Sequence, residues 1–221
     1  MADYSATLTR VEDYFDRSAT KVWERLTSDA SVSRIRQTVR EGRDRMRAIM
    51  LAQLPDDLRG ARVLDAGCGA GQMTAELAAR GADVVAVDIS PALIDIARAR
   101  LPDAHQGRVT FHAGDMLADQ LGRFDHVVAM DSLIYYTAPD IAVALNGLAA
   151  RTTGSVVFTV APRTPFLMAF WSLGKLFPRA DRSPIMIPHA WDRLAQATPG
   201  LTRVGRVSRG FYISECLEVR S

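Results

Sequence analysis

The chain has 221 residues, of which 48% are hydrophobic and 24% are charged, and its net charge is +2. This length suits one large domain with a sizeable core, and so small a net charge favours neither nucleic acid nor an anionic membrane as a partner. Cys68 and Cys216 are the only cysteines, and they form neither a zinc-ligand pattern nor a disulfide framework. We therefore expect a cytoplasmic protein with no nucleic-acid partner, no resident metal, no signal peptide and no membrane span.

The first part of the chain is predicted to be helical. One helix is expected over about 8–26, and a second begins near Val32, where apolar residues recur at helical spacing. Four arginines share another face of this second helix: Arg36, Arg40, Arg43 and Arg47. Residues 1–55 are therefore expected to form a helical cap, and residues 56–221 the main domain.

From residue 61 onward, short apolar runs alternate with helical patterns. Strands are predicted over 61–66, 82–88, 108–113, 124–131 and 155–161. Helices are predicted between them over 71–80, 91–101 and 139–150, with Pro91 in a first turn after a Ser90 cap. This alternation is typical of βαβ units, so it predicts an α/β fold with a buried parallel sheet.

The end of the chain follows a different pattern. Residues 163–190 read as an apolar insertion after the fifth strand, and a helix is predicted over about 188–197. Strand-like runs at 201–207 and 210–219 follow, with a hairpin turn expected at 208–210.

The run V-L-D-A-G-C-G-A-G at 63–71 places Gly67, Gly69 and Gly71 directly after the first predicted strand. Such a turn lets a ligand approach backbone amides. The spacing is G-x-G-x-G, which differs from the G-x-G-x-x-G of dinucleotide-binding proteins. In addition, the carboxylate of Asp65 would sit poorly beside a pyrophosphate and well beside an ammonium group.

Three acids end the first three strands: Asp65, Asp88 and Asp115. Each alone could simply cap a helix. Because the carboxyl ends of parallel strands meet at one edge, the three are expected to share a crevice there. Asp65 would then face an ammonium, Asp88 a ribose, and Asp115 the amine of an adenine held between Ile89 and Met116. Ammonium, ribose and adenine together describe S-adenosylmethionine.

These stretches, with V-V-A-V-D-I-S, F-H-A-G-D-M and F-D-H-V-V-A-M-D-S-L-I-Y-Y, resemble the motifs of Rossmann-like class I S-adenosylmethionine-dependent methyltransferases over residues 61 to about 160. The resemblance implies a seven-stranded, mostly parallel sheet whose last two strands form an antiparallel hairpin. It also places Met130 at the cofactor. Tyr14, in the first helix, would fold over the cofactor as in similar enzymes, or would pack under the sheet edge.

A narrower resemblance covers nearly the whole chain. V-E-D-Y-F-D, V-S-R-I-R-Q-T-V-R-E-G-R-D, D-S-L-I-Y-Y and F-L-M-A-F-W-S-L-G-K-L-F-P look like the magnesium-protoporphyrin IX O-methyltransferase family of chlorophyll and bacteriochlorophyll biosynthesis. The family implies methylation of the ring-C propionate of Mg-protoporphyrin IX, with transient contact to magnesium chelatase. Another lipophilic acceptor, such as a quinone precursor or fatty acyl chain, and a non-catalytic cofactor-binding module remain as alternatives.

The apolar run at 165–177 is interpreted as a core helix, a lid over the substrate or a contact with the membrane surface. Phe166, Phe170 and Trp171 are candidate substrate contacts. His189 follows this run and could approach the porphyrin, where its imidazole is one option beside water as an axial ligand of magnesium.

Catalysis is expected to need no histidine. The cyanobacterial and plant branches resemble L-I-H-Y where this chain has L-I-Y-Y, so their catalytic histidine maps onto Tyr135. A propionate is already ionised at neutral pH. Tyr135 or Tyr136 would therefore hydrogen-bond one carboxylate oxygen, and Arg40 is the favoured arginine for selecting a carboxylate.

Overall fold

The computed structural model describes residues 4–14, 34–175 and 186–220. Its helices are α1 (Tyr4–Tyr14), α3 (Arg34–Leu51), α4 (Gln72–Ala79), α5 (Pro91–Arg100), α6 (Ala138–Ala149), α7 (Pro165–Lys175) and α8 (Trp191–Ala197). Short 3-10 turns are η2 (Asp103–Arg108), η3 (Asp119–Leu121) and η4 (Leu133–Tyr135). The strands are β1 (Arg62–Ala66), β2 (Asp83–Asp88), β3 (Val109–Ala113), β4 (Phe124–Ala129), β5 (Thr152–Val160), β6 (Leu201–Arg209) and β7 (Tyr212–Arg220).

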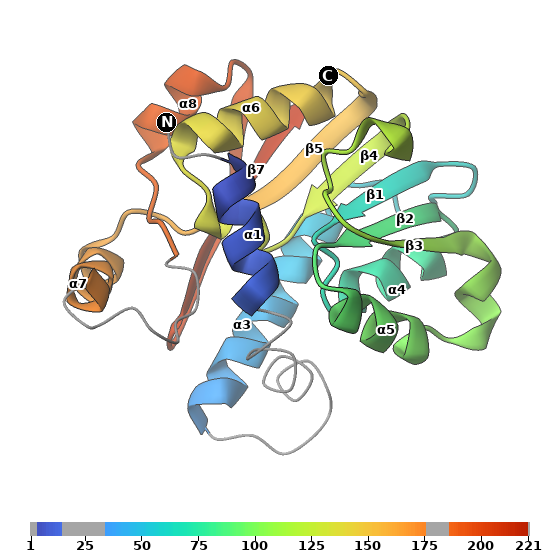
Figure 1. Cartoon of the computed structure of the whole chain (residues 1–221), viewed down its shortest axis with the longest axis horizontal. Coiled ribbons are helices and arrows are strands. Elements are labelled where there is room, and N and C mark those ends of the chain that lie inside the picture. The colour runs from blue at the N-terminus through green and yellow to red at the C-terminus, as the bar shows by residue number, and fades with distance from the viewer. Residues whose placement is uncertain (1–3, 15–33, 176–185, 221) are drawn as a thin grey trace.

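One seven-stranded sheet organises the molecule, in the order β3-β2-β1-β4-β5-β7-β6 (Figure 1). The first five strands are parallel, and β7 lies antiparallel between β5 and β6. The predicted fold class and C-terminal hairpin are thus confirmed. The hairpin turn lies at Gly210–Phe211 rather than at 208–210, because β6 continues to Arg209.

Alternate residues along the buried strands face two different cores. Leu64 and Val85 join a core with α6 and α8, whereas Val63 and Val84 join a second core with α3 and α4. Helices therefore cover both faces of the sheet, which explains why its central strands are almost continuously apolar.

α3 packs tightly across the C-terminal hairpin. A Cβ on Gly42, in the middle of α3, would lie 2.6 Å from Cδ1 of Tyr212 in β7. Arg209 at the end of β6 forms an ion pair with Glu41 at 2.8 Å. The helix that precedes the first strand in sequence is therefore fixed by the last two strands.

Two other predicted features differ in extent or lie outside the described residues. The first helix begins at Tyr4, and the part of the predicted 8–26 helix beyond Tyr14 lies outside the described residues. β4 ends at Ala129 rather than at Asp131, because Asp131 adopts a left-handed backbone conformation with φ 57° that a strand cannot continue.

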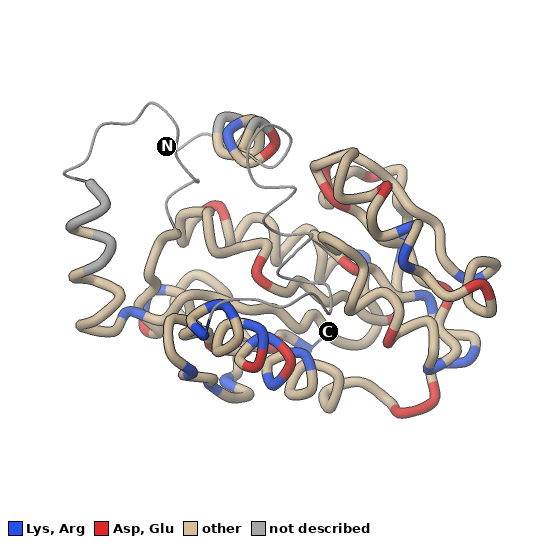
Figure 2. The backbone as a smooth tube through the Cα atoms, turned by 90° about the horizontal axis from the view of Figure 1, so that it is seen from below, with Lys and Arg blue, Asp and Glu red and all other residues tan. Residues whose placement is uncertain are grey.

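α7 stands at one edge of the molecule, well away from α1, and contacts the β6–β7 turn through Phe166 and Phe211 (Figure 1). Figure 2 shows the same separation from below, and charged residues are distributed over the rest of the described chain. Among the described residues, no helix has both the length and the apolar character needed to cross a bilayer.

Candidate active site

A cavity opens at the carboxyl ends of β1, β2 and β4, and it contains about 990 Å³ of space when its open side is counted. The chain turns in opposite directions from β1 and β4, which makes this edge the switch point where α/β sheets bind ligands. Residues from α1, α3, the glycine loop and the segment after β4 line the wall, among them Leu8, Val11, Arg43, Arg47, Asp65, Gly67, Gly69, Asp88, Ile89, Met116, Met130, Asp131, Ser132, Tyr135 and Tyr136.

The three glycines of the loop serve different purposes. A Cβ on Gly67 would lie 2.3 Å from Cβ of Ser132, and one on Gly71 would lie 2.9 Å from Cβ of Ala97 in α5. Both positions are therefore required by packing, and Gly71 is not in the wall. Gly69 has φ 54° and nothing within 4 Å of its added Cβ, so its backbone faces open space. Only Gly69 leaves room that a ligand could fill.

Asp65 is the most buried acid at this edge, with 1% of its surface exposed. The Thr74 hydroxyl of α4 donates a hydrogen bond to its Oδ2 at 2.6 Å. Burial raises the pKa of Asp65 to about 7, the Thr74 bond opposes this shift and nearby Asp88 adds to it. A cation bound at this carboxylate would therefore relieve an unfavourable burial.

Asp88 braces the glycine loop. Its Oδ2 accepts from the Gly69 amide at 2.8 Å, and its Oδ1 accepts from the Ser90 amide at 3.0 Å. Each carboxylate oxygen can accept more than one hydrogen bond, so these contacts leave capacity for ribose hydroxyls. Ile89 lies beside it in the wall, and its contact with an adenine stays a prediction.

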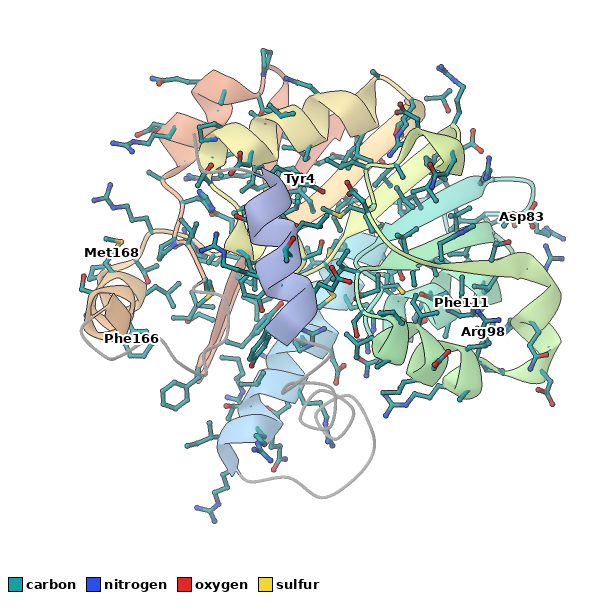
Figure 3. The ribbon with its side chains drawn as sticks, in the orientation of Figure 1. Tyr4, Asp83, Arg98, Phe111, Phe166 and Met168 are labelled. Carbon is teal, nitrogen blue, oxygen red and sulfur yellow. The ribbon has the colours of Figure 1, made fainter. Side chains whose placement is uncertain are left out.

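Asp115 is not in the wall, although its neighbour Met116 is. Its Oδ1 accepts from the Tyr4 hydroxyl at 2.7 Å and from the Leu117 amide at 2.8 Å. The Tyr4 ring also stacks on Tyr136, with 5.0 Å between the ring centroids. Figure 3 shows Tyr4 on α1, close to α6. The start of α1 is thus attached to the acid that was predicted to bind adenine.

α1 forms part of the cavity roof through Leu8 and Val11. Tyr14 is not in the wall and packs instead with Val11 and Leu93 of α5. The α1 residues above the cavity are therefore the aliphatic ones, whose role the sequence analysis missed. Their 3-residue spacing on the helix was the available signal.

Arg40 is also absent from the wall, where α3 places Arg43 and Arg47 instead. Nη1 of Arg43 contacts Oδ2 of Asp131 at 2.5 Å. Asp131 was not among the predicted site residues, although it is a fourth acid just beyond a strand. Its position after β4 was the signal that could have identified it.

Tyr135 and Tyr136 both lie in the wall. Burial raises the pKa of each hydroxyl above its ordinary value, with a further contribution from Asp131 at Tyr135 and from Asp115 at Tyr136. Both tyrosines are therefore neutral near pH 7 and can donate hydrogen bonds there.

Phe166 is the one predicted α7 substrate residue whose side chain the structure describes, and it is not in the cavity wall. Phe166 is 50% exposed, and its ring centroid is 6.3 Å from that of Phe211 in the hairpin turn. Figure 3 shows Phe166 and Met168 on α7, well separated from Tyr4. The side chains of Phe170 and Trp171 lie outside the described residues. No described α7 side chain lines the cavity, and the interpretation of this helix as a lid stays a prediction.

His189 is 6% exposed and is not in the cavity wall. Burial lowers the pKa of its imidazole to about 4, although a hydrogen bond to the Tyr136 backbone opposes the shift. Its Nε2 is buried and has no hydrogen-bond partner among the described residues. Within those residues, no group of three or more His, Cys, Asp or Glu side chains is arranged to hold a metal ion.

Known proteins are similar to this chain in sequence and in fold. A family model described as "Magnesium-protoporphyrin IX methyltransferase C-terminus" matches residues 129–221, and one described as "Methyltransferase domain" matches residues 63–153. The chain is 65% identical over 221 residues to the magnesium-protoporphyrin O-methyltransferase of Rhodobacter capsulatus, which covers 99% of each chain. It is 30% identical to the magnesium-protoporphyrin O-methyltransferase of Synechocystis, over 96% of each.

Solved structures agree with the sequence comparison. The crystal structure of magnesium protoporphyrin IX methyltransferase from Synechocystis with bound SAH superposes with a TM-score of 0.80 and 29% identity, over 96% of this chain and 98% of that one. The structure of the same enzyme with bound SAM gives a TM-score of 0.77. Sequence identity, family model and fold together place this chain in the magnesium-protoporphyrin O-methyltransferase family.

Proposed function

We propose that this protein transfers a methyl group from S-adenosylmethionine to the ring-C propionate carboxylate of Mg-protoporphyrin IX, which gives the 13-monomethyl ester. The observation that carries the proposal is 65% identity, over 99% of both chains, to a relative named for this activity. In (bacterio)chlorophyll biosynthesis, magnesium insertion is predicted to precede this methylation. Closure of the fifth ring is predicted to follow it.

The cavity fits the cofactor. The open space beside Gly69 would accept a ligand against the backbone, which a side chain there would obstruct. Asp65 would hold the ammonium group and Asp88 the ribose, while Ile89, Met116 and Met130 would contact the remainder. An adenine amine at Asp115 would compete with the Tyr4 hydroxyl that this carboxylate now accepts.

The chemistry requires orientation rather than proton transfer. A propionate is ionised at neutral pH, so its oxygen is already the nucleophile. When bound, S-adenosylmethionine supplies a methyl group that the oxygen takes, while the electron pair of the broken carbon–sulfur bond stays on sulfur. The neutral hydroxyls of Tyr135 and Tyr136 can donate to the second carboxylate oxygen and hold the first in line. Leu8 and Val11 exclude water from above.

A turnover assay tests this function directly. Purified protein, S-adenosylmethionine and Mg-protoporphyrin IX should yield S-adenosylhomocysteine and a porphyrin that is heavier by one methylene, identified by mass. Its position is assigned by nuclear magnetic resonance of the ester. Mg-protoporphyrin dimethyl ester, which has no free carboxylate, is the matched substrate control and should give no turnover.

The same assay decides between the alternatives. Ester formation with a quinone precursor or a fatty acid, and none with the porphyrin, would replace the proposed acceptor. Cofactor binding without turnover on any acceptor would favour a non-catalytic module.

The cofactor site has a test of its own. Asp88→Ala should abolish cofactor binding seen by calorimetry, and an unchanged rate of methyl transfer in this variant would contradict the proposed cofactor site.

Contacts with magnesium chelatase and with the membrane surface are also proposed. The support for a surface contact is the exposed Phe166–Phe211 pair on α7 and the hairpin turn. Flotation with anionic vesicles should recover the protein, and Phe166→Ser should reduce that recovery. An equal recovery for the two proteins would contradict a membrane contact through α7.

A further inference from the structure

Arg43 and Asp131 bring together two charges 88 positions apart in the chain. Their side chains are only 15% and 8% exposed, and both line the cavity. A pair this buried needs further hydrogen bonds to be favourable. The Arg43–Asp131 ion pair is therefore a buried component of the cavity wall and not a surface ion pair.

Asp131 is fixed from two other strands. Its Oδ1 accepts from the Tyr212 hydroxyl of β7 at 3.0 Å and from the Thr159 hydroxyl of β5 at 3.2 Å. Its own amide donates to Thr159 Oγ1 at 2.8 Å, which holds the unusual φ of 57° in place. A non-glycine residue keeps such a backbone only where its surroundings determine it, and such residues cluster at functional sites.

The hydrogen bonds that fix Asp131 also fix the guanidinium of Arg43, which lies near Tyr135 in the cavity wall. Tyr135 shares the cavity wall with both members of the pair, and the charges of Asp131 and Arg43 act on its hydroxyl in opposite directions. The guanidinium has five N–H donors in a planar fork, and Nη1 contacts Asp131. A fork of this kind can serve two carboxylates at once.

Among the described residues, two arginines line this cavity, Arg43 and Arg47. The proposed reaction brings two carboxylates to it, one on the methionine part of the cofactor and one on the acceptor. Arg47 is as little exposed as Arg43, at 16% against 15%, but its partner Asp44 is 49% exposed, so the Arg47–Asp44 pair is open to solvent on one side. Arg43 has a buried partner next to the tyrosines. We propose that Arg43 binds the acceptor carboxylate and that Asp131 is the positioning residue that aims its guanidinium.

Asp131 has a second effect in this arrangement. A guanidinium that paired fully with the acceptor would hold the nucleophilic oxygen back from the methyl group. Because Asp131 competes for the same guanidinium, the acceptor is held more weakly and one of its oxygens stays available. This inference rests on the proposed function, since it assumes a carboxylate acceptor.

The test compares Mg-protoporphyrin IX with its dimethyl ester, which lacks both carboxylates. Binding is followed by the shift of the porphyrin absorption band without S-adenosylmethionine, so that turnover plays no part. The parent protein should bind the diacid about ten- to a hundredfold more tightly than the diester, as a charged hydrogen-bonded pair implies. Arg43→Gln should remove this preference and leave diester affinity unchanged.

Arg45→Gln is the matched control, because Arg45 is exposed on the same helix and lies outside the cavity wall. It removes the same charge and should keep the preference for the diacid. Arg40→Gln, at the arginine favoured by the sequence, should keep it as well. Equal losses in all three variants would show a general attraction by α3 and would overturn the assignment.

Asp131→Asn gives a readout that a purely structural role would not produce. With its competitor neutralised, Arg43 should hold the diacid several-fold more tightly while kcat falls, so KM and kcat should decrease together. If Arg43→Gln fails to fold because Asp131 is left unpaired, the Arg43→Gln/Asp131→Asn double variant removes both charges and should still lose the preference.

The outcomes separate this inference from the proposed function. A parent protein that neither binds nor methylates the porphyrin contradicts the function, whatever Arg43 does. A parent that methylates it, with an Arg43→Gln variant that keeps its preference for the diacid, contradicts the inference alone. So does an Arg43→Gln variant that loses only affinity for S-adenosylmethionine, since Arg43 would then bind the cofactor.

Discussion

The Thr74 hydroxyl donates to Oδ2 of Asp65 at 2.6 Å inside the protein, where Asp65 is 1% exposed. The hydrogen bond fixes the carboxylate but does not supply a positive charge. Burial therefore raises the pKa of Asp65 from its ordinary value of 3.8 to about 7. Near neutral pH both the protonated and the ionised form of Asp65 are populated, and a bound ammonium group would favour the ionised form.

Cofactor binding should therefore release protons. At pH 7 we expect about half a proton per S-adenosylmethionine bound, since the group is about half protonated when the pH equals its pKa. Calorimetry in two buffers with different ionisation enthalpies measures this number. Asp65→Asn keeps an acceptor for Thr74 and should bind without proton release. Equal release by the parent and by this variant would show that another group titrates.

Asp65 should also make the protein without ligand less stable as the pH rises. Its folded-state pKa is above the unfolded value, so its contribution to stability is complete below about pH 4 and is lost as the pH rises to about 7. Urea unfolding at pH 4, 5.5 and 7 should give a smaller decrease in Asp65→Asn than in the parent. A decrease of the same size in both would contradict the assigned pKa.

Gly42 and Gly147 should respond oppositely to the same substitution. A Cβ on Gly42 would lie 2.6 Å from Cδ1 and 2.9 Å from Cβ of Tyr212, and the latter atom cannot move without its backbone. Gly42→Ala should therefore destabilise the fold by about 1–3 kcal/mol, as overpacking does. Gly147 is exposed in α6 with nothing within 4 Å, so Gly147→Ala should stabilise by about 0.5–1 kcal/mol.

Urea unfolding of both alanine variants measures the difference. The Gly42→Ala variant should also lower affinity for Mg-protoporphyrin IX, because Tyr212 supports Asp131 and through it Arg43. A Gly42→Ala protein as stable as the parent would show that α3 and β7 are not packed this closely.

Much of this fold could be predicted because its signals are local. Buried parallel strands read as apolar runs, and Ser90 before Pro91 marks the start of α5, where the Ser90 hydroxyl accepts from the Leu93 amide. Asp65 and Asp88, which both line the cavity, could be singled out because an acid at a strand end can be read from neighbouring residues. Their contacts with Thr74 and the Gly69 amide lie within twenty positions.

The remaining parts of the site depend on contacts between distant segments. Arg43 and Asp131 meet across 88 positions, and no local pattern distinguishes Arg43 from Arg40 on the same helical face. Asp115 was expected to face adenine, but Tyr4, 111 positions away, donates to it. The burial of His189 likewise follows from pairing with the chain near Ala161, which the sequence of the apolar insertion does not reveal.

Tyr135→Phe should slow catalysis modestly. Its hydroxyl is neutral near pH 7 because burial raises its pKa, so it can orient the acceptor but cannot act as a base. We expect kcat to fall by less than about a hundredfold, and a loss above about 10⁴-fold, the upper range of acid–base catalysis, would contradict the orienting role. The pH dependence of kcat between 6 and 9 should keep its shape in the variant. A rising limb that disappears with the hydroxyl would indicate a tyrosinate base instead.

His189 should make the protein sensitive to acid. Its folded-state pKa of about 4 is below its ordinary value of 6.5, so its contribution to stability is complete above about pH 6.5 and is lost as the pH falls toward 4. The loss is on the order of 3 kcal/mol, since one pKa unit corresponds to about 1.4 kcal/mol. His189→Asn can keep a donor toward the Tyr136 backbone without a titrating ring, and it should flatten this decrease in urea unfolding between pH 6.5 and 4. If the variant and the parent lose equal stability over this range, the imidazole is already charged or is not buried.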